Sequence, residues 1–163
     1  MSNAAASMES KVRRLRPADL ERVIAIDSGH VGEPRRVFFE KRLAHAREHP
    51  EDYVQVGVVR DGELVGFAFA RIQRGEFGRE QAIATLDAVG VMFGSREAGV
   101  GHTLMGGLTE ALRQQEVRSL QSQADWTNHG LLRFFEASGF HLAPRLVLER
   151  SALTLLPEPV DGD

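Results

Sequence analysis

The chain has 163 residues, 42% of them hydrophobic and 26% charged, which suits one globular domain with an apolar core. Its formal net charge of −3 argues against nonspecific binding to nucleic acid. Because it has no cysteine, disulfides, thiol nucleophiles and thiolate metal sites are excluded. No apolar run approaches the ~20 residues that span a bilayer. We therefore expect no nucleic-acid or membrane partner and a cytoplasmic location.

The two ends of the chain are expected to lie outside the fold. Residues 1–10 lack both the basic start and the apolar segment of a signal peptide, and we interpret them as an expression tag or a disordered leader, with Met8 as the native start. Residues 155–163, which include Pro157 and Pro159, are expected to fray. The sequence shows no internal repeat and no linker, so residues 1–163 are treated as a single domain.

The first half of the chain predicts a strand, two helices and a hairpin. Ser28-Gly29 is expected to end the first helix, and Pro34 suits the first turn of the second. Asp61-Gly62, between two alternating apolar segments, is a strong hairpin signal. The expected order is a strand over 12–16, helices over 17–27 and 33–48, and strands over 53–59 and 63–72.

The second half alternates strands and helices. The expected order is a strand over 81–92, a helix over 99–115, a strand over 118–124, a helix over 128–137 and a last strand over 141–150. Gly106 and Gly107 lie inside the first of these helices, where each costs about 1 kcal/mol relative to alanine. Close packing is our interpretation of both. Trp126, which precedes the second helix, is expected to cover the core rather than to line a binding pocket.

The turn from Val91 to Gly101 is the most informative segment. It reads Val91-Met-Phe-Gly-Ser-Arg96-Glu-Ala-Gly99-Val-Gly101 and opens a helix. Glycines allow a ligand to approach the backbone, and the unpaired N–H groups of a helix start favour anions. Neither of the common phosphate fingerprints fits, because a dinucleotide motif needs glycine where Leu104 stands and no Gly-Lys-Ser/Thr follows. The turn nevertheless predicts a pyrophosphate site.

From Val91 onward the sequence resembles motif A of the GCN5-related N-acetyltransferases (GNAT), with Arg96-x-x-Gly99-x-Gly101 as its loop. A second segment, Asn128 to Gly139-Phe140 with Phe135 near the helix end, resembles motif B of the same family. The resemblance implies a single-domain α/β fold, with a mixed, largely antiparallel twisted sheet flanked by helices and splayed at its central strands. It also implies that acetyl-CoA is the cosubstrate and that no metal takes part.

By this resemblance, the coenzyme contacts begin on the strand that ends at Val91. The backbone near Val89 and Val91 would pair with the pantetheine amides, and Asn128 would cap its helix, bond the pantetheine, or do both. The pyrophosphate would lie on the guanidinium, the amides and a hydroxyl of the loop and helix start, which comprise Arg96, Glu97, Ala98, Gly99, Val100, Gly101, His102 and Thr103.

Two positions depart from the family pattern. Glu97-Ala98 replaces the glycine and basic residue that many relatives carry, so its carboxylate must turn away from the phosphates. Phe135 stands where many relatives have a tyrosine that protonates the leaving thiolate. Phenylalanine cannot donate that proton, which leaves water or Ser138 as candidates. The leaving thiol has a pKa near 8.5 if it behaves like cysteine, so the loss need not abolish transfer.

The implied reaction is the transfer of an acetyl group from acetyl-CoA to a primary amine, on a small molecule, a protein N-terminus or a lysine, by direct attack in a ternary complex. The amine must first lose a proton. Asp87 is the acidic residue of the strand over 83–91 and is our candidate base; alternation places it on the same face as Val89 and Val91. A backbone N–H near Val91 would meet the oxyanion.

Two other functions remain open at this point. The first is an acyl-CoA-binding sensor or interaction module of the same fold with little catalysis, which Phe135 and Glu97 motivate. The second is a zinc hydrolase, because His45-Ala-Arg-Glu48-His49 matches an inverted zinc-peptidase signature. Two histidines near a helix C-terminus are more simply explained by the helix dipole. The sequence leaves monomer and homodimer open.

Overall fold

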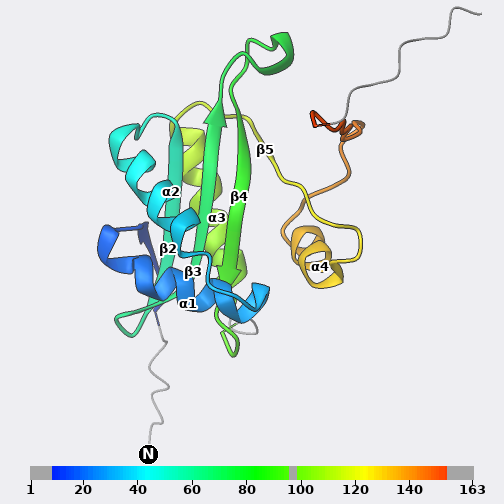
Figure 1. Ribbon diagram of the computed structural model, residues 1–163. Coiled ribbons are helices and arrows are strands. Elements are labelled where there is room, and N and C mark those ends of the chain that lie inside the picture. The colour runs from blue at the N-terminus through cyan, green and yellow to red at the C-terminus, as the bar shows by residue number, and fades with distance from the viewer. Residues whose placement is uncertain (1–8, 96–98, 154–163) are drawn as a thin grey trace, which may run out of the picture.

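The computed structural model describes residues 9–95 and 99–153. It contains a five-stranded sheet with α-helices on both faces (Figure 1). The elements in chain order are β1 (Lys11–Arg14), η1 (Pro17–Asp19), α1 (Leu20–Val31), α2 (Arg36–Glu48), β2 (Tyr53–Arg60), β3 (Glu63–Gln73), η2 (Glu76–Gly78), β4 (Ile83–Val91), α3 (Val100–Gln114), β5 (Ser119–Gln121) and α4 (His129–Ala137). No helix among these residues is long and apolar enough to cross a membrane.

The strands follow one another across the sheet in chain order, from β1 to β5. All neighbours are antiparallel except β4 and β5, which are parallel. The helix α3 connects these two strands, as the crossover between parallel neighbours requires. The predicted fold class, a mixed and largely antiparallel α/β sheet, is confirmed.

Two apolar clusters fill the two faces of the sheet. On one face, α3 packs Leu104 and Leu108 against the alternate valines of β2, and Phe135 of α4 joins the same cluster. On the other face, α1 and α2 cover Phe67 and Phe69 of β3. Burying each of these large side chains stabilises the fold by about 1.5–3 kcal/mol. The sheet is therefore apolar on both sides, which explains the nearly continuous burial of β2 and β3.

A β-bulge interrupts β4 at Asp87. Phe69 of β3 pairs with Ala88, whereas the next residue, Ala70, pairs with Leu86, so Asp87 is the extra residue of the ladder. The bulge shifts the alternation of β4 by one residue. Leu86 and Val89 both pack in the cluster under α3, while Ala88 packs in the cluster under α1 and α2.

The sheet is splayed beyond β4. The ladder between β4 and β5 comprises only Ile83 to Thr85 paired with Ser119 to Gln121. After it, the Ser122 hydroxyl donates a hydrogen bond to the carbonyl of Leu86, at 3.0 Å, and the chain then leaves for α4 (Figure 1). The splay predicted at the central strands is thus confirmed, and it leaves the second half of β4 open on this side.

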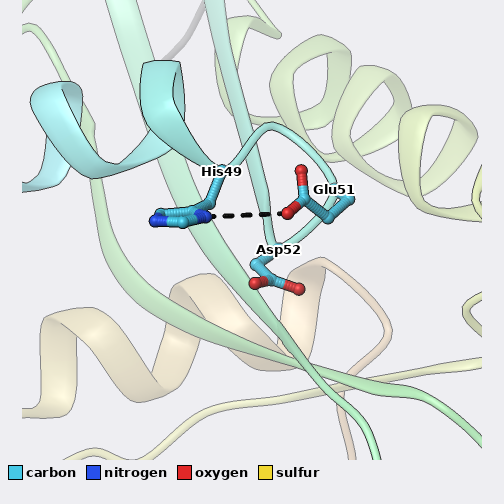
Figure 2. Close-up of side chains that lie close together, drawn as sticks. All are labelled: His49, Glu51 and Asp52. Atoms are coloured by element: carbon cyan, nitrogen blue, oxygen red, sulfur yellow. Dashed lines mark ion pairs between the residues drawn. The ribbon is translucent and has the colours of Figure 1, made fainter.

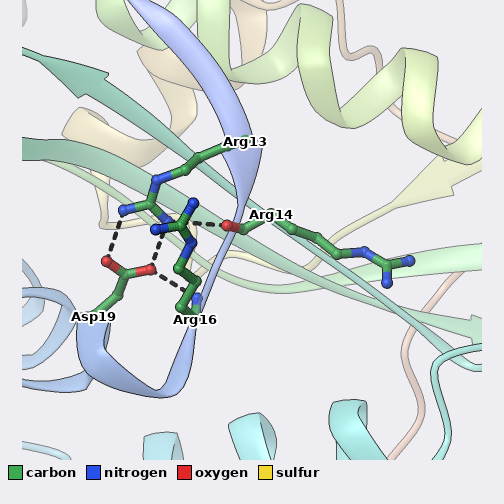
Figure 3. A network of polar contacts seen from close by, with 4 residues as sticks. All are labelled: Arg13, Arg14, Arg16 and Asp19. Carbon is green, nitrogen blue, oxygen red and sulfur yellow. Dashed lines mark hydrogen bonds and ion pairs between the residues drawn. The ribbon is translucent and has the colours of Figure 1, made fainter.

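A bidentate ion pair ties the edge of the sheet to the first helices (Figure 3). The guanidinium of Arg13 on β1 donates to both carboxylate oxygens of Asp19, at 2.7 and 2.8 Å. The backbone N–H of Arg16 donates to the same carboxylate, at 2.7 Å. Asp19 is buried, and these three bonds compensate for the loss of its hydration.

Several predicted boundaries are wrong. The first helix continues past Ser28-Gly29 to Val31, because the left-handed C-cap is Gly32 at φ 89°. The second helix begins at Arg36 rather than 33, because Arg35 is held outside it by Asp27. The fifth strand is limited to Ser119–Gln121 rather than 118–124, since β4 and β5 diverge there.

The last predicted strand, over 141–150, is absent from the described part of the chain. The segment lies away from the sheet, beyond α4 (Figure 1), where no neighbouring strand can supply ladder partners. Trp126 is also not core cover as predicted, because 87% of it is exposed. The exposure follows from its place on the chain that crosses from β5 to α4, beyond the end of the ladder.

Candidate functional site

A cavity of about 740 Å³ lies where β4 diverges from β5. Its walls come from the second half of β4, the end of α1, the start of α3 and the inner side of α4. It therefore passes from the α1 face of the sheet to the α4 face through the splay. The predicted site residues that line it are Asp87, Val89, Val91, Gly101, Asn128 and Phe135.

The start of α3 has the geometry of an anion site. Gly99 is its N-cap in the left-handed conformation, at φ 74°. The first N–H groups of a helix have no hydrogen-bond partner within the helix, so they can donate to an anion. The amide of Thr103 is not one of them, contrary to prediction, because it donates to the carbonyl of Gly99 at 3.0 Å. Arg96, Glu97 and Ala98 lie outside the described residues.

Three further positions at this helix start have different environments. Val100 is fully buried in the core, so only its backbone could meet a ligand, and His102 is exposed. A Cβ on Gly101 would come within 3.0 Å of the Phe134 ring. The absence of a Cβ at Gly101 therefore lets α3 pack closely against α4, and it also leaves room for a ligand to approach the backbone.

Asp87 enters the cavity between two arginines. Its carboxylate lies 3.2 Å from Arg42 of α2 and 3.6 Å from Arg71 of β3, and 12% of its side chain is exposed. Arg42 belongs to the helix layer opposite α3, so the bulge turns Asp87 to that face. The prediction that Asp87 shares a face with Val89 and Val91 is wrong, because both valines pack under α3.

His30 is a cavity residue that the sequence analysis did not single out. Its Nε2 lies 2.8 Å from the carbonyl of Val91, so the ring nitrogen donates to that oxygen. Its ring stacks on Phe93, with 4.9 Å between centroids. The sequence analysis missed His30 because it ended the first helix before this residue. It is the last turn of α1 that brings His30 to β4.

The second feature that the sequence analysis missed is the pair of Asp27 and Arg35 in the cavity wall. Two hydrogen bonds of 2.6 and 2.8 Å join them, and 3% of the Asp27 side chain is exposed. The hydrogen bonds to Asp27 hold the pKa of Arg35 above its ordinary value, although burial opposes this. The guanidinium also lies 5.1 Å from the ring centre of Phe38. The pair fixes the turn between α1 and α2.

The α4 wall is formed by Asn128 and Phe135. The Asn128 side chain accepts a hydrogen bond from the amide of Leu131, at 3.2 Å, which confirms the predicted helix cap. Phe135 is buried, and its ring packs against that of Phe140 at a tilt of 41°, with 4.7 Å between centroids. Ser138 does not line the cavity, and its hydroxyl donates to the carbonyl of Phe134, at 2.7 Å. Its candidacy as the acid is therefore overturned.

The predicted zinc set of His45, Glu48 and His49 is not assembled. Of the described residues, the side chains that could share one ion are His49, Glu51 and Asp52 (Figure 2). His49 lies 3.6 Å from Glu51, and both are exposed. His49 is the C-cap of α2, with φ −128°, so the turn of helix that would have aligned it with His45 is not continued. Asp52 is instead paired with Arg74, at 2.8 Å.

A family model described as "Acetyltransferase (GNAT) family" matches residues 18–140. The match covers most of the chain, so the chain belongs to the GNAT acetyltransferase family and is an enzyme of the acyltransferase class. No curated protein matches it.

Solved structures share the fold at low sequence identity. A transcriptional regulator from Bacillus halodurans is 18% identical with a TM-score of 0.74, covering 88% of this chain and 99% of that one. An aminoglycoside 6'-N-acetyltransferase from Acinetobacter baumannii is 17% identical with a TM-score of 0.71, covering 88% and 98%. AAC(6')-Iy in complex with a bisubstrate analogue containing CoA is 20% identical with a TM-score of 0.68, covering 88% and 98%.

Proposed function

We propose that this chain transfers an acetyl group from acetyl-CoA to a primary amine by direct attack in a ternary complex. The observation that carries the proposal is the single cavity that joins the start of α3 to Asp87 through the splayed sheet. A cosubstrate that enters at the α3 end and an amine that enters at the α1 face would meet along β4.

The backbone geometry of β4 and of the start of α3 supports the proposed binding of the coenzyme. The outer edge of β4 beyond Leu86 has no strand ladder on the β5 side, so it can pair with the amides of a pantetheine arm at Val89. The Val91 carbonyl already accepts a bond from His30, which leaves it one lone pair. The loop from Arg96 to Ala98, together with the amides of Val100, Gly101 and His102, is proposed to hold the pyrophosphate.

The acceptor end is proposed to use Asp87 as the base, directly or through a water molecule. The carboxylate lies between Arg42 and Arg71, and a carboxylate both attracts an ammonium group and can accept its proton. The freed amine nitrogen then bonds to the thioester carbon and gives up a second proton to water, and the carbon–sulfur bond breaks. Its electron pair leaves with the coenzyme thiolate. Phe135 has no proton to give, so the thiolate leaves as such or is protonated by water.

We propose a small-molecule amine as the acceptor. Related folds described as aminoglycoside and glucosamine-6-phosphate N-acetyltransferases act on such amines, and the cavity of about 740 Å³ suits a compact substrate. A protein N-terminus or lysine is the competing acceptor. A panel of both kinds, monitored by thiol release from acetyl-CoA, separates them. The reaction needs no metal.

The acyl-CoA-binding module remains the second candidate, because Phe135 removes the hydroxyl that would serve as the acid. In that case acetyl-CoA binds, but no amine of either kind accelerates thiol release. Thiol release that depends on the concentration of an amine contradicts this candidate.

The coenzyme site is tested by two variants of Gly99 that differ in charge alone. Apart from its chain neighbours, no atom of the described residues lies within 4 Å of a Cβ at this position, and its φ is 74°. Asparagine and aspartate tolerate this conformation best among the other residues. Gly99→Asp puts a negative charge beside the pyrophosphate, whereas Gly99→Asn has the same shape without the charge. By calorimetry, we expect the Kd for acetyl-CoA to rise at least about tenfold in Gly99→Asp relative to Gly99→Asn.

The aspartate variant is not expected to be less stable, because a negative charge at a helix start is favourable. Thermal unfolding of both variants is the control. Equal affinity in two folded variants contradicts the proposed phosphate site, and a wild type that does not bind acetyl-CoA contradicts the whole proposal.

A further inference from the structure

Three arginines gather at the acceptor end of the cavity, on the face of the sheet that α1 and α2 cover (Figure 1). Arg35 pairs with Asp27, while Arg42 and Arg71 share Asp87. We call these five side chains the acceptor-side cluster. Among the ion pairs of the described residues, its three cations meet two carboxylates. The cluster therefore has one positive charge in excess, which favours an anionic partner.

Arg35 is the arginine of this cluster that lines the cavity. Its Nε and Nη2 donate hydrogen bonds to Asp27, at 2.8 and 2.6 Å. Its guanidinium also lies 5.1 Å from the ring centre of Phe38 and 5.5 Å from that of Phe39. These contacts hold the guanidinium in one place, so little conformational freedom is left to lose when a ligand binds it.

One edge of this guanidinium remains available to a ligand. The two bonds to Asp27 use Nε and Nη2, and within the described residues Nη1 has no hydrogen-bond partner. Of the two side chains, 36% of Arg35 but 3% of Asp27 is exposed, so the carboxylate is closed off while the guanidinium is open. Its remaining N–H groups suit the oxygens of a carboxylate or a phosphate.

Positive charge is also left over around Asp87. Its carboxylate lies 3.2 Å from Arg42 and 3.6 Å from Arg71. Among the described residues, the Nε of Arg71 is buried without a hydrogen-bond partner, so one carboxylate does not satisfy both guanidinium groups. The Arg42 guanidinium lies 5.2 Å from the ring centre of Phe38, the ring that Arg35 also contacts. A polycationic amine is therefore repelled here, whereas an amine that brings its own negative charge is not.

We propose that the acceptor carries a negatively charged group, a carboxylate or a phosphate, besides its amine, and that Arg35 binds this group. The inference rests on the proposed acetyl transfer and names the substrate class of the same site. Arg35 and Asp87 line one cavity, so one compact molecule can reach both. Asp87 receives the ammonium end, and Nη1 of Arg35 donates to the anionic oxygen. Arg35 thereby determines specificity without taking part in proton transfer.

Matched acceptors test the substrate class on the wild-type protein. Thiol release from acetyl-CoA is measured with pairs in which one member lacks the negative group: phosphoethanolamine and ethanolamine, β-alanine and β-alaninamide, glucosamine-6-phosphate and glucosamine, and ε-aminocaproate and its amide. We expect kcat/KM to be at least about tenfold higher for the anionic member of one or more pairs. The responding pair tells phosphate from carboxylate. Neutral members that are equal or better in every pair, or spermidine as the best acceptor, overturn the proposal.

Arg35→Lys tests the assigned residue, with Arg36→Lys as the matched control. Lysine keeps the positive charge that Asp27 requires but lacks the N–H groups of Nη1. Arg36 pairs instead with Glu21 at the surface, at 2.7 Å. The readout is the ratio of kcat/KM between the two members of the responding pair, in which any inactive fraction of the protein cancels. We expect this ratio to fall at least about tenfold in Arg35→Lys and to stay at the wild-type value in Arg36→Lys.

A purely structural role for Arg35 lowers both rates alike and leaves the ratio unchanged, and that result overturns the proposal. Circular dichroism checks that each variant folds. If Arg35→Lys does not fold, Asp27→Asn/Arg35→Gln replaces it, because this variant leaves no buried charge without a partner. The same fall in the ratio is expected.

Calorimetry separates a failure of this inference from a failure of the proposed transfer. The anionic member of each pair is titrated into protein saturated with CoA, where no reaction takes place. Binding that weakens at least about tenfold in Arg35→Lys, without thiol release by any amine, supports the anion site and contradicts the transfer. Thiol release that depends on amines but shows no preference for anionic members supports the transfer and overturns the anion site.

Discussion

Asp87 owes its position to one extra residue in a strand. The bulge turns its carboxylate toward Arg42 and Arg71, rather than toward the cluster under α3. His30 lies in the same cavity and is the competing base. Geometry alone would permit either group to receive the proton of an amine.

Substitution of the two candidates distinguishes their roles. We expect Asp87→Asn to lower kcat by about 10²-fold or more, because the amide cannot accept the proton, while the Kd for acetyl-CoA stays close to wild type. His30→Gln should lower kcat less, since His30 is hydrogen-bonded to the Val91 backbone. Steady-state kinetics with the best amine, together with calorimetry, measure both. The reverse order of losses would assign the base to His30.

Asp19 links residue chemistry to acid stability. Burial raises its pKa, but the hydrogen bonds from Arg13 and from the Arg16 backbone outweigh burial and hold the pKa below its usual value. A carboxyl with a lowered folded-state pKa stabilises the protein above its unfolded pKa of about 3.9. This contribution is lost as the pH falls through the folded-state pKa.

Asp19→Asn should therefore lower the free energy of unfolding by about 1–3 kcal/mol at pH 7, and the difference from wild type should shrink as the pH falls below about 4. Urea unfolding at a series of pH values measures this. Glu21→Gln is the control, because Glu21 pairs with Arg36 at the surface, and its unfolding midpoint should remain near wild type. A pH-independent loss for Asp19→Asn would contradict the charge-based explanation.

At the scale of the element, α3 contains two adjacent glycines with opposite surroundings. A Cβ at Gly106 would meet no atom within 4 Å, whereas a Cβ at Gly107 would overlap the side chain of Val12 on β1. Close packing therefore explains Gly107, as predicted, but not Gly106. The stiff χ1 of valine leaves Val12 little freedom to yield.

The two glycines thus form a matched pair for measurement. Gly106→Ala should raise the free energy of unfolding by about 0.5–1 kcal/mol, because alanine favours the helix. Gly107→Ala gains the same propensity but forces α3 and β1 apart, and should lower stability by about 1–3 kcal/mol. Chemical unfolding of both variants provides the comparison. Equal effects would mean that Val12 does not limit the approach of α3.

Predictions of single elements succeeded where the signal is local. The Asp61-Gly62 turn is where it was expected, with φ 51° and 81°, and Asn128 caps α4. The predicted end of α1 was wrong because Gly29 and Gly32 can both end a helix, and it is Gly32 that adopts the left-handed conformation. The bulge at Asp87 could not be predicted from alternation, since a bulge breaks the period on which that reasoning depends.

At the scale of the molecule, a mixed, largely antiparallel and splayed sheet followed from the resemblance, but the wall of the cavity formed by α1 did not. The start of α3 and the cap of α4 could be predicted because each depends on residues close together in the sequence, namely Gly99 with Gly101 and Asn128. Asp27, Arg35 and His30 meet β4 only because α1 and α2 fold over the sheet, and no spacing in the sequence encodes that. The same reason explains why the strand predicted over 141–150 is missing, because alternation in a sequence does not supply the neighbouring strand that a ladder needs.

The bulge at Asp87 also constrains how the length of this chain can change. Deleting one residue of β4 while the bulge remains would move the residues on one side of the deletion to the opposite layer, whereas a deletion at the bulge would remove the extra residue that turns Asp87. The connection from β3 to β4 is different, because Gly75 and Gly78 turn in open space with no atom within 4 Å of a Cβ. Insertions and deletions should therefore be tolerated around residues 74–80, whereas the strand that follows keeps its residue count.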